Sequence, residues 1–479
     1  MSEFVSATEK AEQVNLPQDT RQQRKNFILN YFSMGIVAVL LALIGTHIYI
    51  TADYFNSFVS FYGYYNYCVF NLIKLIILLF TLNMYVLFTR RIYNKGRMCC
   101  KSKPLSPLSK DQIIFVYTCF IFVIIAFIVD LVIFMNQFMN VSYGPVTVIN
   151  GGQTQIHWYT DKKSGSTVKT NSKIYSTDEL TKFHNVLVDE TNFDYQIDGI
   201  DANFTYQLPN DINKFIVMTD IHCIDQYTHN MDLDYDFNLL VGDYSYGGLP
   251  HEFARTFKNM HQKPVIMAVG NHDALGYHDQ LVQREANFYQ RIGKLGFYFL
   301  FVMKTNNLAD CQFVNDSRVD DSIEFLNQNI HLSSQDEHVF IVTHQPMYST
   351  DMYGSHKYFT EQIEAFLDQN QDKKIRAVFS GHDHIFSAFR RGYQYQFING
   401  AAGPIDDMHS ILNGNRVWKE DSLSGPLEVK DDRCLGYQQH LDSVMKVTRT
   451  EVTFQGNQIQ YTIRDLDTNE VFKVYMQDF

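Results

Sequence analysis

The sequence predicts an α/β domain, arranged as an α+β sandwich, that follows a small all-β sandwich and three transmembrane helices. Apolar runs in the second half of the chain alternate with helical patterns such as SIEFLNQNI and YFTEQIEAFL, which is typical of α/β proteins. Short runs of alternating apolar residues between 144 and 210 predict the antiparallel sandwich. Three stretches in the first third are long and apolar enough to cross a bilayer.

The predicted membrane region covers residues 27–139, with helices at about 27–50, 67–88 and 113–138. Lys and Arg are frequent before the first helix and between the second and third, but absent between the first and second. The positive-inside rule then makes residues 1–26 a cytosolic tail and places everything after the third helix on the other side. We expect an integral membrane protein whose C-terminal part is luminal or extracellular. In a mitochondrial inner membrane, the same topology would place that part in the intermembrane space.

The stretch 144–210 contains the runs VTVI, TQIHWYT, STVKT, HNVLV, FDYQID and NFTYQL, separated by turn signals such as Asn150-Gly151-Gly152. Short strands at this spacing are the signature of a small sandwich. Trp158 is the expected aromatic residue of its core.

Five segments further along the chain carry residue types that bind metal ions. Each contains Asp, Asn or His and follows an apolar run that predicts a buried strand. In an open α/β sheet, the carboxyl ends of parallel strands form the usual site. Carboxylate and imidazole ligands suit a pair of hard or borderline cations. The five segments are Asp220-Ile-His222, Gly242-Asp243, Gly270-Asn271-His272-Asp273, Thr343-His344 and Gly381-His382-Asp383-His384.

This ordered set of D-x-H, G-D, G-N-H-D, H and G-H-x-H resembles the calcineurin-like metallophosphoesterase superfamily. The layout is most similar to purple acid phosphatases, in which a fibronectin-III-like domain precedes the metallophosphoesterase domain; here a transmembrane region is added. The resemblance implies a metallophosphoesterase domain over 213–479 whose C-terminal strands form a second sheet. It also implies an acid-phosphatase-like hydrolase with two metal ions, which would be Fe, Mn or Zn, and a phosphate-ester substrate.

The resemblance also assigns roles to residues. It implies that Asp243 bridges the ions and that His272 is catalytic, by donating a hydrogen bond to the phosphate or protonating the leaving oxygen. Asp273 would orient His272. Tyr246 fits a G-D-x-x-Y pattern in which the tyrosine ligates Fe(III), but His222 offers an alternative ligand, so the role of Tyr246 is open. The implied first metal takes Asp220, His222, Asp243 and His384, and the second takes Asp243, Asn271, His344 and His382.

The formal net charge of −12 argues against nucleic acid as the main partner. Three N-x-S/T sequons, at Asn140, Asn203 and Asn315, follow the third predicted helix and predict a glycoprotein. Cys311 and Cys434 would pair only if their Cα atoms come close.

An alternative function is a catalytically idle subunit with a phosphatase fold and a structural role in a larger membrane assembly.

Overall fold

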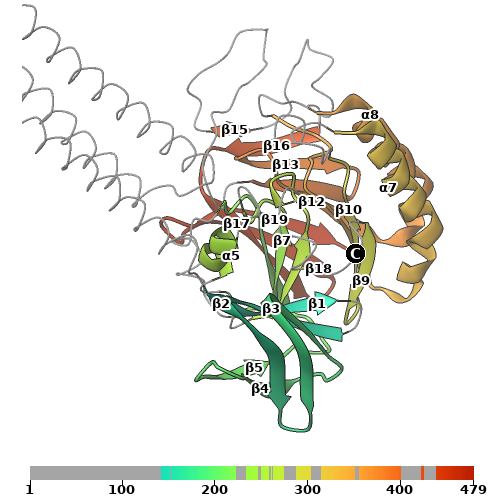
Figure 1. Cartoon of the computed structure of the whole chain (residues 1–479). Coiled ribbons are helices and arrows are strands. Elements are labelled where there is room, and N and C mark those ends of the chain that lie inside the picture. Colours follow the sequence, from blue (N-terminus) through green and yellow to red (C-terminus); the bar gives the residue numbers. More distant parts are fainter. Residues whose placement is uncertain are drawn as a thin grey trace, which may run out of the picture. The chain divides into compact units, whose positions relative to one another are not determined.

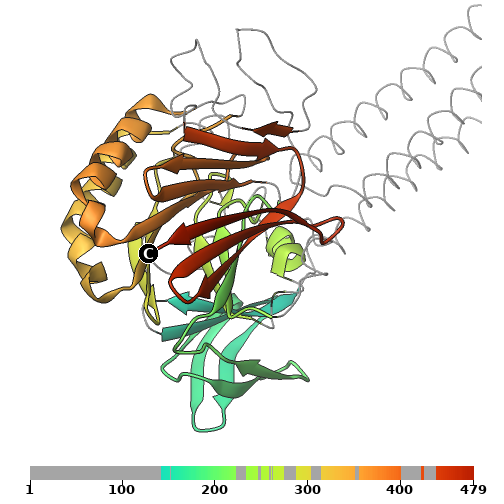
Figure 2. The ribbon, with the colours of Figure 1, turned by 180° about the vertical axis from the view of Figure 1, so that it is seen from behind.

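Two β-sheets pack face to face in the described part of the chain (Figures 1 and 2). The structure is a computed structural model, and all described residues belong to one unit of the chain. It describes residues 142–150, 153–222, 234–245, 250–257, 260, 263–273, 287–303, 314–350, 355–400, 422–424 and 439–479.

The first sheet is mixed, with a parallel centre formed by β6, β7, β8 and β1. Its strands, in spatial order, are β19 (Val471–Asp478), β18 (Gln458–Asp465), β17 (Thr448–Gln455), β6 (Lys214–Met218), β7 (Phe237–Val241), β8 (Val265–Ala268), β1 (Tyr143–Asn150), β2 (Gln153–Thr170), β4 (Phe193–Ile197) and β5 (Asn203–Tyr206), with β3 (Ile174–Val188) paired to β2.

The second sheet is also mixed, and its parallel strands are β10, β11, β12 and β14. In spatial order it contains β15 (Ser422–Ser424), β16 (His440–Val444), β13 (Phe386–Arg391), β14 (Gln394–Asn399), β12 (Ile375–Ser380), β11 (His338–Thr343), β10 (Leu295–Leu300) and β9 (Phe288–Ile292).

Alternating side chains build the layers, because successive residues of a strand face opposite sides of its sheet. On β11, Phe340 and Val342 join the core between the sheets, whereas Val339 and Ile341 pack with the outer helices α7 (Asp316–Asn329) and α8 (Lys357–Gln369). Both views show these helices along one side of the second sheet. Helix α5 (Pro250–Phe257) packs on the outer face of the first sheet. The predicted α+β sandwich is therefore present.

The strands expected to form a separate small sandwich lie in the first sheet instead. β1 pairs with β8 in parallel, Val148 opposite Val265, and with β2 in the antiparallel sense. Because β1 is apolar on both faces and buried along most of its length, it fits an inner position in a covered sheet. Strands β2–β5 still enclose a small core of their own, and Trp158 is buried in it as predicted.

The C-terminal strands also differ from the expectation. β17 pairs with β6 in the antiparallel sense, so β17–β19 extend the first sheet and do not form a second one. Val452, Tyr461 and Ile463 from these strands face the core between the sheets, and burial of these side chains favours this position.

No helix among the described residues has the length and apolarity needed to cross a bilayer. The three predicted transmembrane helices, together with Asn140, Cys311 and Cys434, lie outside the described residues.

Candidate metal centre

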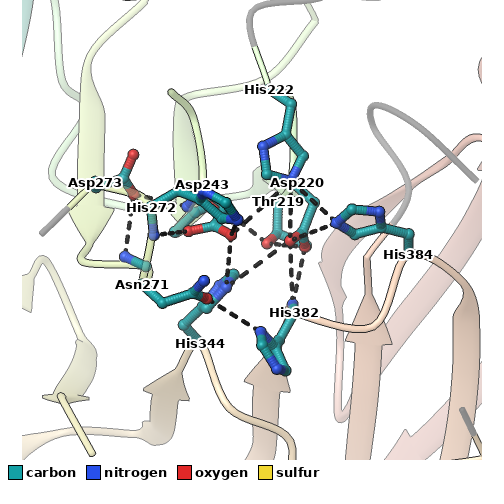
Figure 3. A network of polar contacts seen from close by, with 12 residues as sticks. Thr219, Asp220, His222, Asp243, Asn271, His272, Asp273, His344, His382 and His384 are labelled. Atoms are coloured by element: carbon teal, nitrogen blue, oxygen red, sulfur yellow. Dashed lines mark hydrogen bonds and ion pairs between the residues drawn. The ribbon is translucent and has the colours of Figure 1, made fainter. Parts of the chain in front are cut away.

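The predicted ligands meet at the carboxyl ends of strands from both sheets (Figure 3). Asp220 and His222 follow β6, Asp243 follows β7, and Asn271 and His272 follow β8, all in the first sheet. The second sheet supplies three imidazoles from the residues after β11 and β12. Parallel strands end at a common edge of their sheet, so ligands distant in sequence converge. The imidazoles of the second sheet belong to His344, His382 and His384.

The backbone at these positions adopts a rare conformation. Four site residues have positive φ, namely Asp220 at 53°, His222 at 45°, Asp243 at 50° and His382 at 73°. Only three other non-glycine residues in the described part of the chain do so. Such conformations are typically maintained where the surrounding structure supports a functional geometry. The sharp turns aim each side chain back across the strand ends.

Motif glycines allow the loops to touch. A Cβ atom on Gly270 would lie 2.0 Å from Asp243 Oδ1, and one on Gly381 would lie 2.6 Å from Asp220 Oδ2. A Cβ on Gly242 would lie 2.5 Å from Nδ1 of His344. These distances are far below van der Waals contact, so each position requires glycine. The glycines of the motifs therefore have a packing role at the site.

Two carboxylates lie at the centre of the cluster. Asp220 Oδ1 lies 3.6 Å from Nε2 of His384 and 3.8 Å from Nε2 of His222. It also lies 3.8 Å from Nε2 of His344. Asp243 Oδ2 lies 3.2 Å from Nε2 of His344 and 3.9 Å from Nε2 of His222. Two groups could therefore each hold an ion: Asp220 with His222 and His384, and Asp220 with Asp243 and His344.

Hydrogen bonds select which ring nitrogen is available to a metal. His344 Nδ1 lies 2.8 Å from the Val241 carbonyl oxygen and donates to it, which leaves Nε2 directed at the carboxylates. His222 and His384 approach each other through their Nε2 atoms at 3.0 Å. A backbone carbonyl that accepts from the other ring nitrogen is the usual support for a metal-bound histidine.

Asn271 and His382 form the remaining part of the cluster. Asn271 Oδ1 and His382 Nδ1 are 3.1 Å apart, a spacing that suits two ligands of one ion. The backbone N–H of His382 donates to both carboxylate oxygens of Asp220, at 3.2 and 3.0 Å. This backbone contact ties His382, a ligand of the expected second site, to Asp220, a ligand of the expected first site.

The electrostatics of the cluster suit cations. Burial raises the pKa of Asp220 to about 6. Burial lowers the pKa of His382 to about 3, with a further contribution from His344, so the His382 ring is neutral and able to bind metal. Burial disfavours charge on His344 as well, but Asp243 and Asp220 outweigh it and raise its pKa to about 10. The negative charges of Asp243 and Asp220 thus favour a positive charge at this position.

The donor set fits two metal ions. Asp220 and Asp243 are buried, and within the described residues neither forms an ion pair with Lys or Arg. A buried carboxylate is normally paired or bound to metal. The histidine nitrogens and carboxylate oxygens match the ligands that Fe, Zn and Mn take in proteins.

Asp273 has a different role from the one that the resemblance implies. Its Oδ2 accepts hydrogen bonds from the backbone N–H of Asp243 at 2.6 Å and of Gly270 at 3.0 Å. Its Oδ1 accepts from the N–H and the hydroxyl of Ser245, at 3.0 and 2.9 Å. None of these bonds reaches His272, because the turn directs the carboxylate towards the backbone of the neighbouring loop. Asp273 therefore ties two ligand loops together and does not orient His272.

His272 instead lies close to Asp243. Its Nε2 atom is 4.0 Å from Asp243 Oδ2, and its backbone N–H donates to Asp243 Oδ1 at 3.0 Å.

Thr219, which the sequence did not single out, donates its hydroxyl to Asp220 Oδ2 at 2.6 Å. Its position directly before the D-x-H motif was the available signal. Tyr246 lies outside the described residues, so its role as a ligand stays a prediction.

A comparison with protein-family sequence models agrees with this geometry. The calcineurin-like phosphoesterase family matches residues 213–386, which contain every described residue of the cluster. This part of the chain is a calcineurin-like phosphoesterase domain. The cluster found in the structure consists of residues from the five segments found in the sequence, and it lies within this domain. A comparison with curated protein sequences gives no match.

A comparison with solved structures finds several similar chains. A purple acid phosphatase, PPD1 from yellow lupin, is 10% identical with a TM-score of 0.52, over 71% of this chain and 74% of that chain. GAP50, the anchor in the inner membrane complex of Plasmodium, is 12% identical with a TM-score of 0.39, over 56% and 89%. A dimetal phosphatase from Danio rerio is 8% identical with a TM-score of 0.37, over 56% and 99%. Of these three, the lupin enzyme alone exceeds 0.5, and its likeness shows a common fold.

Proposed function

We propose that this protein is a metal-dependent hydrolase of phosphate esters. The proposal is supported above all by the buried donor set, in which two carboxylates and four imidazoles meet at strand ends of a phosphoesterase domain. Two bound metal ions would supply charge neutralisation on the phosphate and an activated water. The residues that would hold them are Asp220, His222, Asp243, Asn271, His344, His382 and His384, with Tyr246 as a further candidate.

His272 is the residue suited to move a proton. It is the fifth imidazole of the cluster, and the two candidate ion groups do not include it. Its ring lies edge-on to His222, with centroids 5.2 Å apart, and the residue is 9% exposed. A substrate phosphate on the metals would come within reach of its Nε2 atom. There the ring can donate a hydrogen bond to the phosphate or protonate the leaving oxygen, as in an acid-phosphatase-like reaction.

The test is metal analysis combined with a hydrolysis assay on the full chain. The wild type should bind two ions of Fe, Mn or Zn and cleave p-nitrophenyl phosphate, whereas Asp243→Asn should lose both properties. Asp336→Asn is a matched control, because Asp336 is a buried carboxylate held away from the site by Tyr289 and Arg291. It should keep its metal and its activity.

A wild type without bound metal and without hydrolysis at acidic or neutral pH would refute the enzyme proposal. It would favour the idle subunit of a larger membrane assembly. An equal loss of metal and activity in Asp336→Asn would show that the losses arise from misfolding and not from removal of a metal ligand.

We further propose that residues 27–139 anchor the protein in a lipid bilayer with the phosphoesterase domain on the non-cytosolic side. The apolar stretches and the distribution of Lys and Arg support this topology. Protease added to sealed vesicles from the cytosolic side should spare the domain. Its digestion would overturn the topology, and fractionation would separate a secretory membrane from the mitochondrial inner membrane.

A further inference from the structure

A hydrogen bond beneath the cluster joins two of its loops. The Ser349 hydroxyl donates to Oδ2 of Asp383, and both residues are fully buried. Ser349 lies five residues after His344, and Asp383 lies between His382 and His384. The same two loops are also joined by the N–H of Gly381, which donates to the carbonyl of His344 at 3.0 Å.

The Ser349 end of this bond is held rigidly. Gln396 on β14 accepts a hydrogen bond from the Tyr348 N–H at 2.8 Å and donates to the Tyr348 carbonyl at 2.6 Å. The Ser349 N–H donates to the Ser355 hydroxyl at 3.0 Å. Thr360 of α8 donates its hydroxyl to the Met347 carbonyl at 2.6 Å. The backbone from Met347 to the Ser349 N–H is therefore fixed to β14, to α8 and to Ser355 shortly before that helix.

The Asp383 end is a tight turn without room to shift. The Asp383 N–H donates to the Gly381 carbonyl at 2.8 Å, and the Asp383 carbonyl accepts from Ile385 at 2.7 Å. A Cβ atom on Gly400 would lie 1.5 Å from that carbonyl oxygen, so the residue that follows β14 abuts the turn directly. His382, the preceding residue, has a φ of 73° that requires support from its surroundings.

We propose that Ser349 and Asp383 form a positioning clamp for the metal ligands His344, His382 and His384. The inference rests on the proposed metal-dependent function and extends it to two residues that do not touch the ions. The hydrogen bond connects the G-H-D-H turn to the segment that β14 and α8 hold in place. It thereby fixes the positions of His382 and His384 relative to His344. Ligands are held to about 0.5 Å only when such supporting contacts fix them.

The test measures Mn²⁺ affinity in metal-stripped full-length protein by equilibrium dialysis and by the rise in melting temperature on adding Mn²⁺. The variants are Ser349→Ala, Asp383→Ala and the double replacement, with Asp383→Asn in the cycle if Asp383→Ala fails to fold. The matched control is Ser322→Ala, because Ser322 is a fully buried serine of α7 whose hydroxyl donates to Asn287 at 3.1 Å. Loss of such a supporting contact typically lowers metal affinity about 10- to 100-fold.

The clamp predicts that each single variant loses Mn²⁺ affinity to this extent. The double variant should bind Mn²⁺ as well as the single variant with the lower affinity, because either replacement already breaks the same hydrogen bond. Ser322→Ala should bind Mn²⁺ like the wild type. Unchanged affinity in Ser349→Ala, additive losses in the double variant, or an equal loss in Ser322→Ala would each overturn it. Wild-type protein that binds Mn²⁺ but hydrolyses no phosphate ester would refute the proposed function alone. Wild-type protein that binds none of Mn, Fe and Zn would refute both.

Discussion

Replacing Gly270 with alanine should displace Asp243 and disable the site. The new Cβ atom would lie 2.0 Å from Asp243 Oδ1 and 2.3 Å from the Asp243 backbone nitrogen. Ordinary contact begins at 3.4 Å, so the carboxylate oxygen would have to move by about 1.4 Å. That movement strains the hydrogen bond from the His272 N–H to Oδ1 and the bond from the Asp243 N–H to Asp273. The backbone contact leaves no flexible group that can yield instead.

The magnitude follows from these distances. A displacement of about 1 Å at a catalytic centre costs about 100-fold in rate, so kcat/KM should fall by at least that factor. Overpacking of this kind lowers the free energy of unfolding by about 1–3 kcal/mol. Metal content should fall below two ions per chain, because Asp243 is central to the donor set.

The assay combines metal analysis, p-nitrophenyl phosphate hydrolysis and urea unfolding. Gly165→Ala is the control: its Cβ would lie 3.2 Å from the Thr177 carbonyl oxygen, on the β2–β3 hairpin. It should change none of the three measurements by much. A Gly270→Ala protein with two tightly bound ions and near wild-type kcat/KM would refute the reasoning from loop contact.

Four further predictions address single residues. His272→Ala should keep its metal while kcat falls about 10²–10⁴-fold, as expected on loss of a general acid; loss of metal would make His272 a ligand. Asp273→Asn places an amide against backbone N–H groups, so urea unfolding should show a loss of about 1–3 kcal/mol, and unchanged stability would argue against its role between the loops. Burial opposes ionisation of Glu451, but hydrogen bonds from Arg464 and Arg449 lower its pKa to about 2. Its contribution to stability is therefore complete above its usual pKa of 4.5 and is lost as pH falls towards 2, so the stability difference between wild type and Glu451→Gln should shrink between pH 6 and 3. Asn203 is exposed on β5, so Asn203→Gln should remove a glycosidase-sensitive mass shift in protein from a secretory membrane; no shift in the wild type would contradict glycosylation.

Much of the candidate site could be predicted from the sequence. Each metal-binding segment follows an apolar strand, and strand ends bring such segments together whatever the details of packing. The structure places Asp220 and Asp243 among the imidazoles of His222, His344 and His384, as those positions imply. Trp158 is buried, because alternation along β2 directs it to the core.

Strand order could not be predicted in the same way. The runs that form β1 and β17 have the alternation and length of strands, but periodicity does not specify a neighbour. Pairing with β8 and β6 depends on which exposed edge offers a matching apolar face, and that is settled when the whole sheet forms.

The sequence by itself determined the residue types of the centre, their order and the strand ends that carry them. Only the tertiary structure decided the roles of the buried polar residues behind them. The hydrogen bonds of Asp273 to Ser245 and of Ser349 to Asp383 join residues 28 and 34 positions apart. A buried carboxylate takes whichever donors surround it after folding, and no local pattern in the chain specifies those donors in advance.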